Sequence, residues 1–243
     1  MSNKKPKTRL YTSQELKVGL VCLVDGNKGH HLVNVTRTKM GDYVNLFNGR
    51  AGEWLGEITK IGKGKAKITV RKKTNEQTFE QDIWYLFAPI KKARVDYVVQ
   101  KATELGVSRI SPVITSRTNL DRIKRDKMVA NCIDAAEQCG RMTIPEVDVM
   151  ISLDEKLNNW PKDRAIIFCD EVEDVNLIQN LKPTSKKWAI LIGPEGGFSP
   201  EERKMLKDHK NTTSISLGSR ILRADTAAVA ALSLWQSYFG CWR

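Results

Sequence analysis

The chain has 243 residues, of which 40 are Lys or Arg and 28 are Asp or Glu, giving a formal net charge of +12. This length suits one large or two small domains with an ample core. The five cysteines are scattered without a C-x-x-C pair, and no apolar stretch follows the basic N-terminus. We therefore expect reduced thiols in a cytoplasmic protein, with no metal site, no signal peptide and no membrane association.

The positive charge is unevenly distributed along the chain. The first 73 residues contain 16 of the 40 basic residues but only 5 of the 28 acidic ones, so the remainder is nearly neutral. This asymmetry indicates a polyanion-binding module joined to a neutral one. A basic surface that only keeps the protein soluble is the alternative explanation.

The segment 1–73 is predicted to be rich in β-strands. Short β-branched or aromatic runs at 18–24, 43–47, 53–61 and 65–70 are separated by glycine-containing turns. Such spacing is typical of a small barrel or sandwich. Lys63, Lys65 and Lys67 alternate along a predicted strand and would share one face. They could contact RNA, or they could protect a solvated sheet edge from aggregation.

The polar segment 74–82 is predicted to be a linker, and beyond it strands alternate with helices. This alternation indicates a parallel sheet covered by helices. The last predicted helix carries no charge after Asp225, so it should be buried nearly all round, in a core or a subunit interface. The expected strands are 83–88, 110–114, 165–169, 188–192 and 214–217, and the expected helices are 91–105, 121–139, 174–181, 199–208 and 225–239.

A glycine-rich loop follows the apolar strand 188–192, with the sequence Gly-Pro-Glu-Gly-Gly-Phe at 193–198. Ser199, Pro200 and Glu202 then predict a capped helix start. Ligands of open α/β sheets bind at such strand-to-helix loops. The loop lacks the phosphate-binding signatures, and Glu195 would repel phosphate, so a ligand with a cationic or polar part and a flat ring fits better. A tight turn without a ligand is the alternative.

Three loops should meet at one edge of this sheet: those after the strands 165–169, 188–192 and 214–217. The third has the sequence Leu-Gly-Ser-Arg-Ile-Leu-Arg-Ala-Asp-Thr-Ala-Ala at 217–228. Together with Ile-Gly-Pro-Glu-Gly-Gly-Phe at 192–198 and Ala-Glu-Gln-Cys-Gly-Arg at 136–141, it resembles the RsmE family of small-subunit rRNA uridine-N3 methyltransferases. That family belongs to the SPOUT class and uses S-adenosylmethionine as methyl donor.

The resemblance implies an α/β fold with an N-terminal PUA-like β-barrel and a C-terminal SPOUT domain that contains a deep trefoil knot. The barrel would be 1–73, the linker 74–82 and the methyltransferase domain 83–243. The family acts as a homodimer, and methylates N3 of a uridine in 16S rRNA within assembled small subunits. Two alternatives stay open: another SPOUT RNA methyltransferase, such as a tRNA ribose 2′-O enzyme, or a non-catalytic RNA-binding or ribosome-assembly factor.

Two residues are candidates for catalysis. Methylation at N3 requires loss of the N3 proton and stabilisation of charge on the flanking carbonyls, which suit the carboxylate of Asp225 and the guanidinium of Arg223. The alternative is a local ion pair of the two that caps the last helix. The family more often has Glu where this chain has Asp225.

The remaining site predictions concern the cofactor and the RNA. Backbone groups of the three loops could hold an adenine, and the glycines would clear space for the methionine part. Cys139 is expected to be a small buried residue rather than a nucleophile. The predicted cofactor-binding residues are Cys169, Asp170, Gly193, Pro194, Glu195, Gly196, Gly197, Leu217, Gly218, Ile221 and Leu222. The predicted RNA-binding residues are Arg9, His31, Arg37, Lys63, Lys65, Lys67, Gln138 and Arg141.

Overall fold

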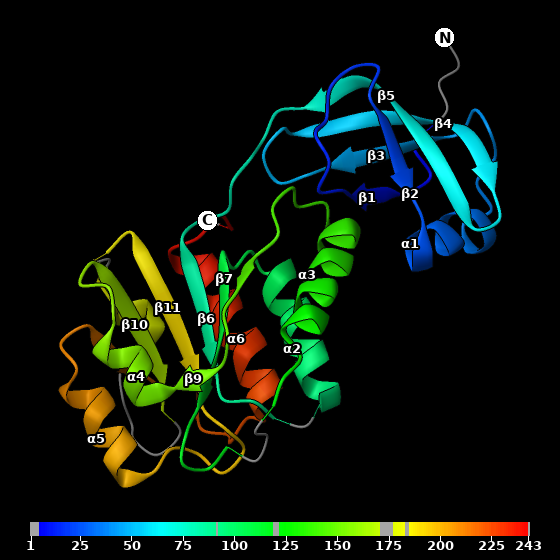
Figure 1. Cartoon of the computed structure of the whole chain (residues 1–243). Helices are drawn as coiled ribbons and strands as arrows, with labels where there is room; N and C mark the ends of the chain where they lie inside the picture. The colour runs from blue at the N-terminus through cyan, green and yellow to red at the C-terminus, as the bar shows by residue number, and fades with distance from the viewer. Residues whose placement is uncertain (1–4, 91, 119–121, 171–176, 183–184, 243) are drawn as a thin grey trace. The chain divides into compact units, whose positions relative to one another are not determined.

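The chain divides into two units in the computed structural model, which describes residues 5–90, 92–118, 122–170, 177–182 and 185–242 (Figure 1). Unit one comprises Met1–Phe79 and Ala136–Ile144, and unit two comprises Glu80–Ala135 and Pro145–Arg243. The sequence predicted that the chain passes from the first module to the second only once, through the linker 74–82. The return of Ala136–Ile144 to unit one was not expected.

Unit one is built on a five-stranded sheet in the order β1-β3-β4-β5-β2. β1 runs parallel to β3, and the other neighbouring strands are antiparallel. Inward side chains from all five strands form one core, as expected for a small barrel. The strands are β1 (Arg9–Tyr11), β2 (Val21–Val24), β3 (Tyr43–Phe47), β4 (Glu53–Gly62) and β5 (Lys65–Asn75); the helical turns are α1 (Gly26–His30) and the π-helix η1 (His31–Val35).

The predicted strands of unit one are present; 43–47 matches β3 at both ends, and the ends of the others are shifted. β2 begins later than predicted because the chain turns at Gly19, which has a φ of 84°. β5 extends to Asn75, so the first two residues of the predicted linker belong to a strand. β1, α1 and η1 were not predicted, since each is too short to show a periodic pattern.

Arg9 holds the segment Ala136–Ile144 within unit one. Its Nη1 donates to the carbonyl of Ala136 at 2.7 Å, and its Nη2 to the carbonyl of Arg141 at 3.2 Å. Its Nε pairs with Glu53 at 2.6 Å. A cation that binds the last carbonyls of a helix also complements the helix dipole, so Arg9 stabilises the C-terminal end of α3 (Arg125–Cys139).

Unit two contains a parallel sheet in the order β12-β10-β11-β6-β7-β8, with β9 paired to β7. Its central strands are buried along their length, as expected where helices cover both faces. The strands are β6 (Ile83–Phe87), β7 (Arg109–Ile114), β8 (Glu146–Val147), β9 (Ile151–Ser152), β10 (Arg164–Cys169), β11 (Lys187–Ile192) and β12 (Thr212–Ile215). The helices besides α3 are α2 (Lys92–Glu104), α4 (Leu153–Asn158), the 3-10 turn η2 (Ile178–Asn180), α5 (Pro200–Asp208) and α6 (Ala224–Tyr238).

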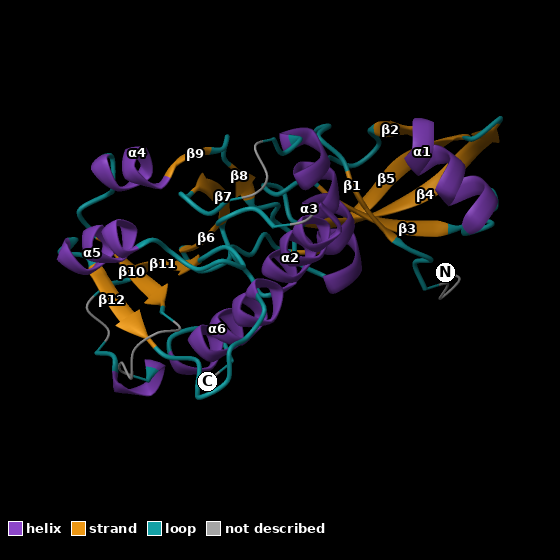
Figure 2. Ribbon diagram, turned by 90° about the horizontal axis from the view of Figure 1, so that it is seen from below, coloured by secondary structure: helices purple, strands orange, loops and turns teal. Residues whose placement is uncertain are grey.

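The helices lie in two layers on opposite faces of the sheet (Figure 2). α4 and α5 cover one face, where Leu157 and Leu206 pack with Phe168 and Leu191 of the strands. α2 and α6 pack against each other on the other face, and α6 also contacts β11. None of the helices in the described ranges is long and apolar enough to cross a membrane.

The predicted helix at 174–181 differs from the structure. In place of the helix at 174–181, the described residues contain only the 3-10 turn η2, and 174–176 lie outside them. The short elements α4, β8 and β9 were missed.

The resemblance also implies a knot. The knot depends on how the segment after β12 passes the connection after β10, and residues 171–176 of that connection lie outside the described residues.

The last helix is buried on one face only. Ala228, Ala231, Leu232, Trp235 and Gln236 are buried, and most other side chains of α6 are partly exposed. The expectation of burial nearly all round is therefore wrong for the single chain. A helix with no charge after Asp225 and one uncovered face remains compatible with the other possibility that the sequence left open, a subunit interface.

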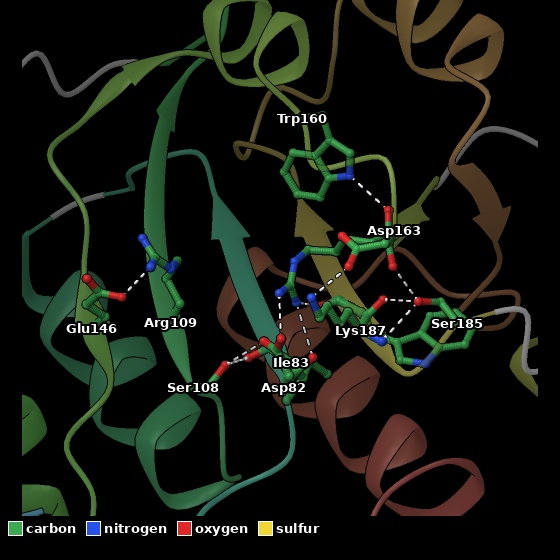
Figure 3. Close-up of polar contacts among 11 residues, drawn as sticks. Asp82, Ile83, Ser108, Arg109, Glu146, Trp160, Asp163, Ser185 and Lys187 are labelled. Atoms are coloured by element: carbon green, nitrogen blue, oxygen red, sulfur yellow. Dashed lines mark hydrogen bonds and ion pairs between the residues drawn. The ribbon is translucent and has the colours of Figure 1, made fainter.

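Arg164 joins the amino ends of three strands at the end of the sheet opposite the glycine loop. Figure 3 shows its partner Asp82, which also accepts a hydrogen bond from Ser108. The buried guanidinium of Arg164 donates to the carboxylate of Asp82 at 2.7 Å and to the carbonyl of Trp188 at 2.9 Å. It also stacks 3.6 Å from the centre of the Trp84 ring. Burial by itself would raise the pKa of Asp82, but hydrogen bonds and charge from Arg164, aided by Ser108, lower it below its usual 3.8.

This lowered pKa predicts acid sensitivity. Because the folded chain holds Asp82 ionised more strongly than the unfolded chain, its contribution to stability is present above about pH 4 and is lost as the pH falls further. We expect Asp82→Asn to reduce the free energy of unfolding by about 1 kcal/mol at pH 7, and by less at pH 3. Urea titrations at both pH values measure this, and an equal loss at both would contradict it.

Candidate active site

Three loops meet at the carboxyl end of the sheet in unit two. β12, β10 and β11 are neighbours and parallel, so the loops that follow them lie at one edge. They enclose a cavity of about 500 Å³. A cavity of this size accommodates a cofactor-sized ligand. The adjacency that the sequence predicted for these loops is confirmed.

The first of these loops, 193–198, is shaped by a tight turn. The amide of Gly197 donates to the carbonyl of Pro194 at 2.9 Å, and Gly197 has a φ of 69°, which favours glycine. The predicted capping box is confirmed: Ser199 Oγ accepts from the amide of Glu202 at 3.2 Å, and the Glu202 carboxylate accepts from the amide of Ser199 at 2.9 Å.

Gly193 has no room for a side chain. A Cβ at this position would lie 2.5 Å from Cε2 of Phe198. Phe198 is buried and packs edge-to-face on Phe168, with ring centres 5.1 Å apart. The aromatic ring therefore closes the base of the loop directly over the glycine.

Gly196 is placed differently from the other predicted cofactor-binding residues of this loop. Gly193, Pro194, Glu195 and Gly197 line the cavity, whereas Gly196 is not among the lining residues. Its carbonyl accepts from Nη1 of Arg117 at 2.6 Å, and a Cβ would meet the Arg117 side chain at an ordinary 3.5 Å. The turn thus directs Gly196 toward the loop after β7.

The end of β10 contributes Cys169 and Asp170, two of the predicted cofactor-binding residues, to the cavity wall. The buried carboxylate of Asp170 pairs with Arg203 of α5. Burial raises the pKa of the Cys169 thiol to about 12, so it remains a neutral thiol at physiological pH. Glu171, which follows, lies outside the described residues.

The loop after β12 closes the cavity with Leu217, Gly218, Ile221, Leu222 and Arg223, among others. Gly218 has a φ of 104°, and a Cβ there would meet nothing within 4 Å, because the position opens onto space. Ile221 is 84% exposed and therefore lies at the rim, whereas Leu222 is partly buried.

The two catalytic candidates lie at the start of α6. Arg223 lines the cavity and is the N-cap residue, although its side chain makes no capping hydrogen bond. Asp225 is not among the lining residues. Its Oδ1 accepts from the amide of Thr226 at 2.9 Å, and its Oδ2 lies 3.8 Å from Nε of Arg94. The alternative in which Asp225 is the N-cap and pairs with Arg223 is therefore wrong.

Three arginines of the cavity wall, Arg94, Arg203 and Arg220, were not among the predicted site residues. Arg94 pairs with Glu195 at 2.5 Å and also faces Asp225. Tyr85 lies behind the wall, where burial, together with neighbouring Cys169 and Asp225, raises its pKa. In the sequence, Arg94 and Arg203 look like ordinary charged positions on helices. Only the pairing of distant elements could have identified them.

Comparison with known proteins shows the family. Residues 77–236 match the RNA methyltransferase domain, and residues 24–71 match the RNA methyltransferase PUA domain. The chain is 31% identical over 229 residues to the ribosomal RNA small subunit methyltransferase E of Rickettsia conorii, covering 93% of each chain. The chain belongs to the ribosomal RNA small subunit methyltransferase E family.

Two solved structures extend this comparison to the fold. The family member from Neisseria gonorrhoeae, bound to S-adenosyl methionine, superimposes with a TM-score of 0.87 at 26% identity, covering 95% of this chain and 97% of that one. A methyltransferase of Legionella pneumophila in complex with the same cofactor gives a TM-score of 0.85 at 31% identity, with the same coverage. The predicted fold class, a PUA-like unit followed by a SPOUT-type α/β unit, is confirmed, and so is the cofactor expected for the family.

The residues that were predicted to bind RNA fall into two groups, those with internal contacts and those exposed on the surface. Arg9 and Arg141 serve internal contacts: Arg9 holds the end of α3, and Arg141 is buried and donates to Thr143 at 3.0 Å. The other six are exposed, namely His31, Arg37, Lys63, Lys65, Lys67 and Gln138.

The lysine series and Cys139 can also be placed. Lys65 and Lys67 alternate with buried residues along β5 and share its outer face, while Lys63 lies in the turn before that strand. Cys139 is exposed, so the expectation of a buried cysteine is wrong. It is the last residue of α3.

Proposed function

We propose that this chain transfers a methyl group from S-adenosylmethionine to N3 of a uridine in 16S rRNA, within the assembled small subunit in the cytoplasm. The observation that carries the proposal is the cavity formed by the three loops, with Arg223 at its wall. Membership of the small-subunit methyltransferase family supports the rRNA as substrate, and the cofactor in two related structures supports the methyl donor.

The cavity suits this cofactor. Gly218 opens onto space where any side chain would project, and the turn at Gly197 lets the backbone approach a ligand closely. The wall combines backbone groups with apolar side chains such as Leu217 and Leu222, which fits an adenine ring. When bound, S-adenosylmethionine supplies an already activated methyl group, so the protein's own residues act mainly by positioning.

We assign Arg223 and Asp225 to the target uridine. The guanidinium of Arg223 would hold the charge that develops on a carbonyl oxygen beside N3. The carboxylate of Asp225 would accept the N3 proton. Asp225 is one methylene shorter than the Glu more usual at this position. Arg94 is the cation near Asp225, and it also pairs with Glu195 of the loop after β11.

The two parts of the chain would divide the work. We propose that the basic N-terminal part, 1–73, anchors the rRNA through His31, Arg37, Lys63, Lys65 and Lys67, that 74–82 is the linker, and that 83–243 carries out the transfer. Gln138 would contribute from the segment that returns to unit one. The first 73 residues hold 16 basic and 5 acidic residues, which favours contact with phosphates.

We also propose that the chain acts as a homodimer. The partly covered face of α6 carries no charge after Asp225, and Tyr238 and Trp242 near its end are 40% and 56% exposed. Few charges and exposed aromatic side chains are typical of a subunit interface. Light scattering of the purified protein measures the mass directly.

The function is tested by mapping N3-methyluridine in small-subunit rRNA from cells that lack the gene. We expect one modified uridine to disappear and to return on expression of the chain. The purified protein should methylate assembled small subunits from these cells more efficiently than naked 16S rRNA. Loss of a ribose 2′-O-methyl group from tRNA instead would favour the other SPOUT reaction. Failure to bind S-adenosylmethionine would favour a non-catalytic assembly factor.

A further inference from the structure

Arg94 occupies an unusual place for a cation. It lies in the first turn of α2, where the helix dipole disfavours positive charge, and that turn contains no acidic residue. Its partners come instead from two distant segments, the cofactor loop and the start of α6. A guanidinium held at the unfavourable end of a helix by carboxylates from elsewhere suggests a role that the helix itself does not need.

The contacts of Arg94 use two sides of its guanidinium. Nη1 donates to Oε1 of Glu195 at 2.5 Å, and Nε faces Oδ2 of Asp225 at 3.8 Å, which is an ion pair but too long for a hydrogen bond. The side chains of Arg94 and Asp225 are only 26% and 20% exposed, so solvent screens this pair less than a surface pair. A planar fork can serve two carboxylates at once, which a lysine cannot do equally well.

Only two of these three residues reach the cavity. Arg94 and Glu195 line it, whereas Asp225 does not. Asp225 would therefore influence a bound cofactor through a neighbour that lines the cavity, and Arg94, whose Nε lies 3.8 Å from its carboxylate, is that neighbour. Without the guanidinium, the two carboxylates on either side of it would repel each other, and the loop carrying Glu195 would move away from α6.

We propose that Arg94 is a positioning residue that couples the start of α6 to the cofactor loop. It holds Glu195 in the cavity wall and keeps Asp225 in place, so that the cofactor site and the catalytic candidate are set by one side chain. The inference rests on the proposed cofactor site but does not depend on which nucleotide is methylated.

The test is a double-mutant cycle on cofactor affinity, measured by calorimetry with S-adenosylmethionine and the full-length protein. Arg94→Gln should weaken binding about fivefold, and Asp225→Asn about threefold, as expected for partly buried ion pairs. In the Arg94→Gln background, Asp225→Asn should no longer weaken binding. Arg94→Lys should recover part of the affinity. Lys101→Gln is the matched control, because it removes the same charge from the same helix, and it should leave the affinity unchanged.

The double-mutant cycle distinguishes coupling through Arg94 from independent effects of the two residues. Equal effects of Asp225→Asn in both backgrounds, or unchanged affinity in Arg94→Gln, would overturn the coupling. Thermal melting shows whether each variant is folded, and a fall in melting temperature shared by Arg94→Gln and Lys101→Gln would mean a general effect on α2. If the wild-type protein binds the cofactor but methylates no rRNA, the proposed function fails while this cycle can still be read.

Discussion

Replacing Arg223 by alanine is expected to lower kcat by about 10²–10³-fold, the usual cost of removing one donor to a developing oxyanion. The side chain lines the cavity and makes no capping hydrogen bond, so the fold does not depend on it. Cofactor affinity and melting temperature should therefore change little. Single-turnover methylation of small subunits, with calorimetry alongside, measures both quantities.

Arg220→Ala is the control for this prediction. It removes the same charge from the same loop, three positions earlier, and Arg220 also lines the cavity. We expect it to weaken RNA binding without a comparable loss of kcat. Equal losses in both variants would show that the loop acts through its overall positive charge, and Arg223 would lose its assigned role at the uridine.

Replacing Gly193 by alanine is expected to damage both the loop and the cofactor site. The new Cβ would lie 2.5 Å from the ring of Phe198, which is buried against Phe168 and cannot easily move. Overpacking of this kind costs about 1–3 kcal/mol of the free energy of unfolding. Because the displaced loop forms the cavity wall, we expect affinity for S-adenosylmethionine to fall by more than about tenfold, equivalent to 1.4 kcal/mol. Calorimetry and urea unfolding measure the two effects.

Gly196→Ala is the matched control, since it makes the same change three residues along the same loop. Its Cβ would meet Arg117 at an ordinary contact distance, outside the cavity lining. We expect nearly unchanged affinity. The sequence alone had predicted Gly196 as a cofactor-binding residue, so a substitution there would have been expected to disrupt the cofactor site. A larger effect of Gly196→Ala than of Gly193→Ala would mean that the loop binds its ligand in another conformation.

Local signals in the sequence were sufficient to predict the strand, turn and helix around the glycine loop. The apolar run 188–192, the glycine loop and the pattern of Ser199 and Glu202 predicted a strand, a turn and a capped helix, and the structure contains all three. These features depend on residues within a few positions of one another, so they can be read without knowing the fold. The concentration of basic residues before residue 74 is likewise a property of the sequence alone.

Only the tertiary structure decided which residues of distant segments meet. Arg9 looked like an RNA contact, but it binds carbonyls of Ala136 and Arg141, more than a hundred residues away. Arg94 was not among the predicted site residues, but it bridges Glu195 and Asp225. The sequence pattern reports which residue types occur at which spacing. It does not report the partner of a charged side chain, because that partner is chosen by strand order and helix packing, and these arise from the whole core.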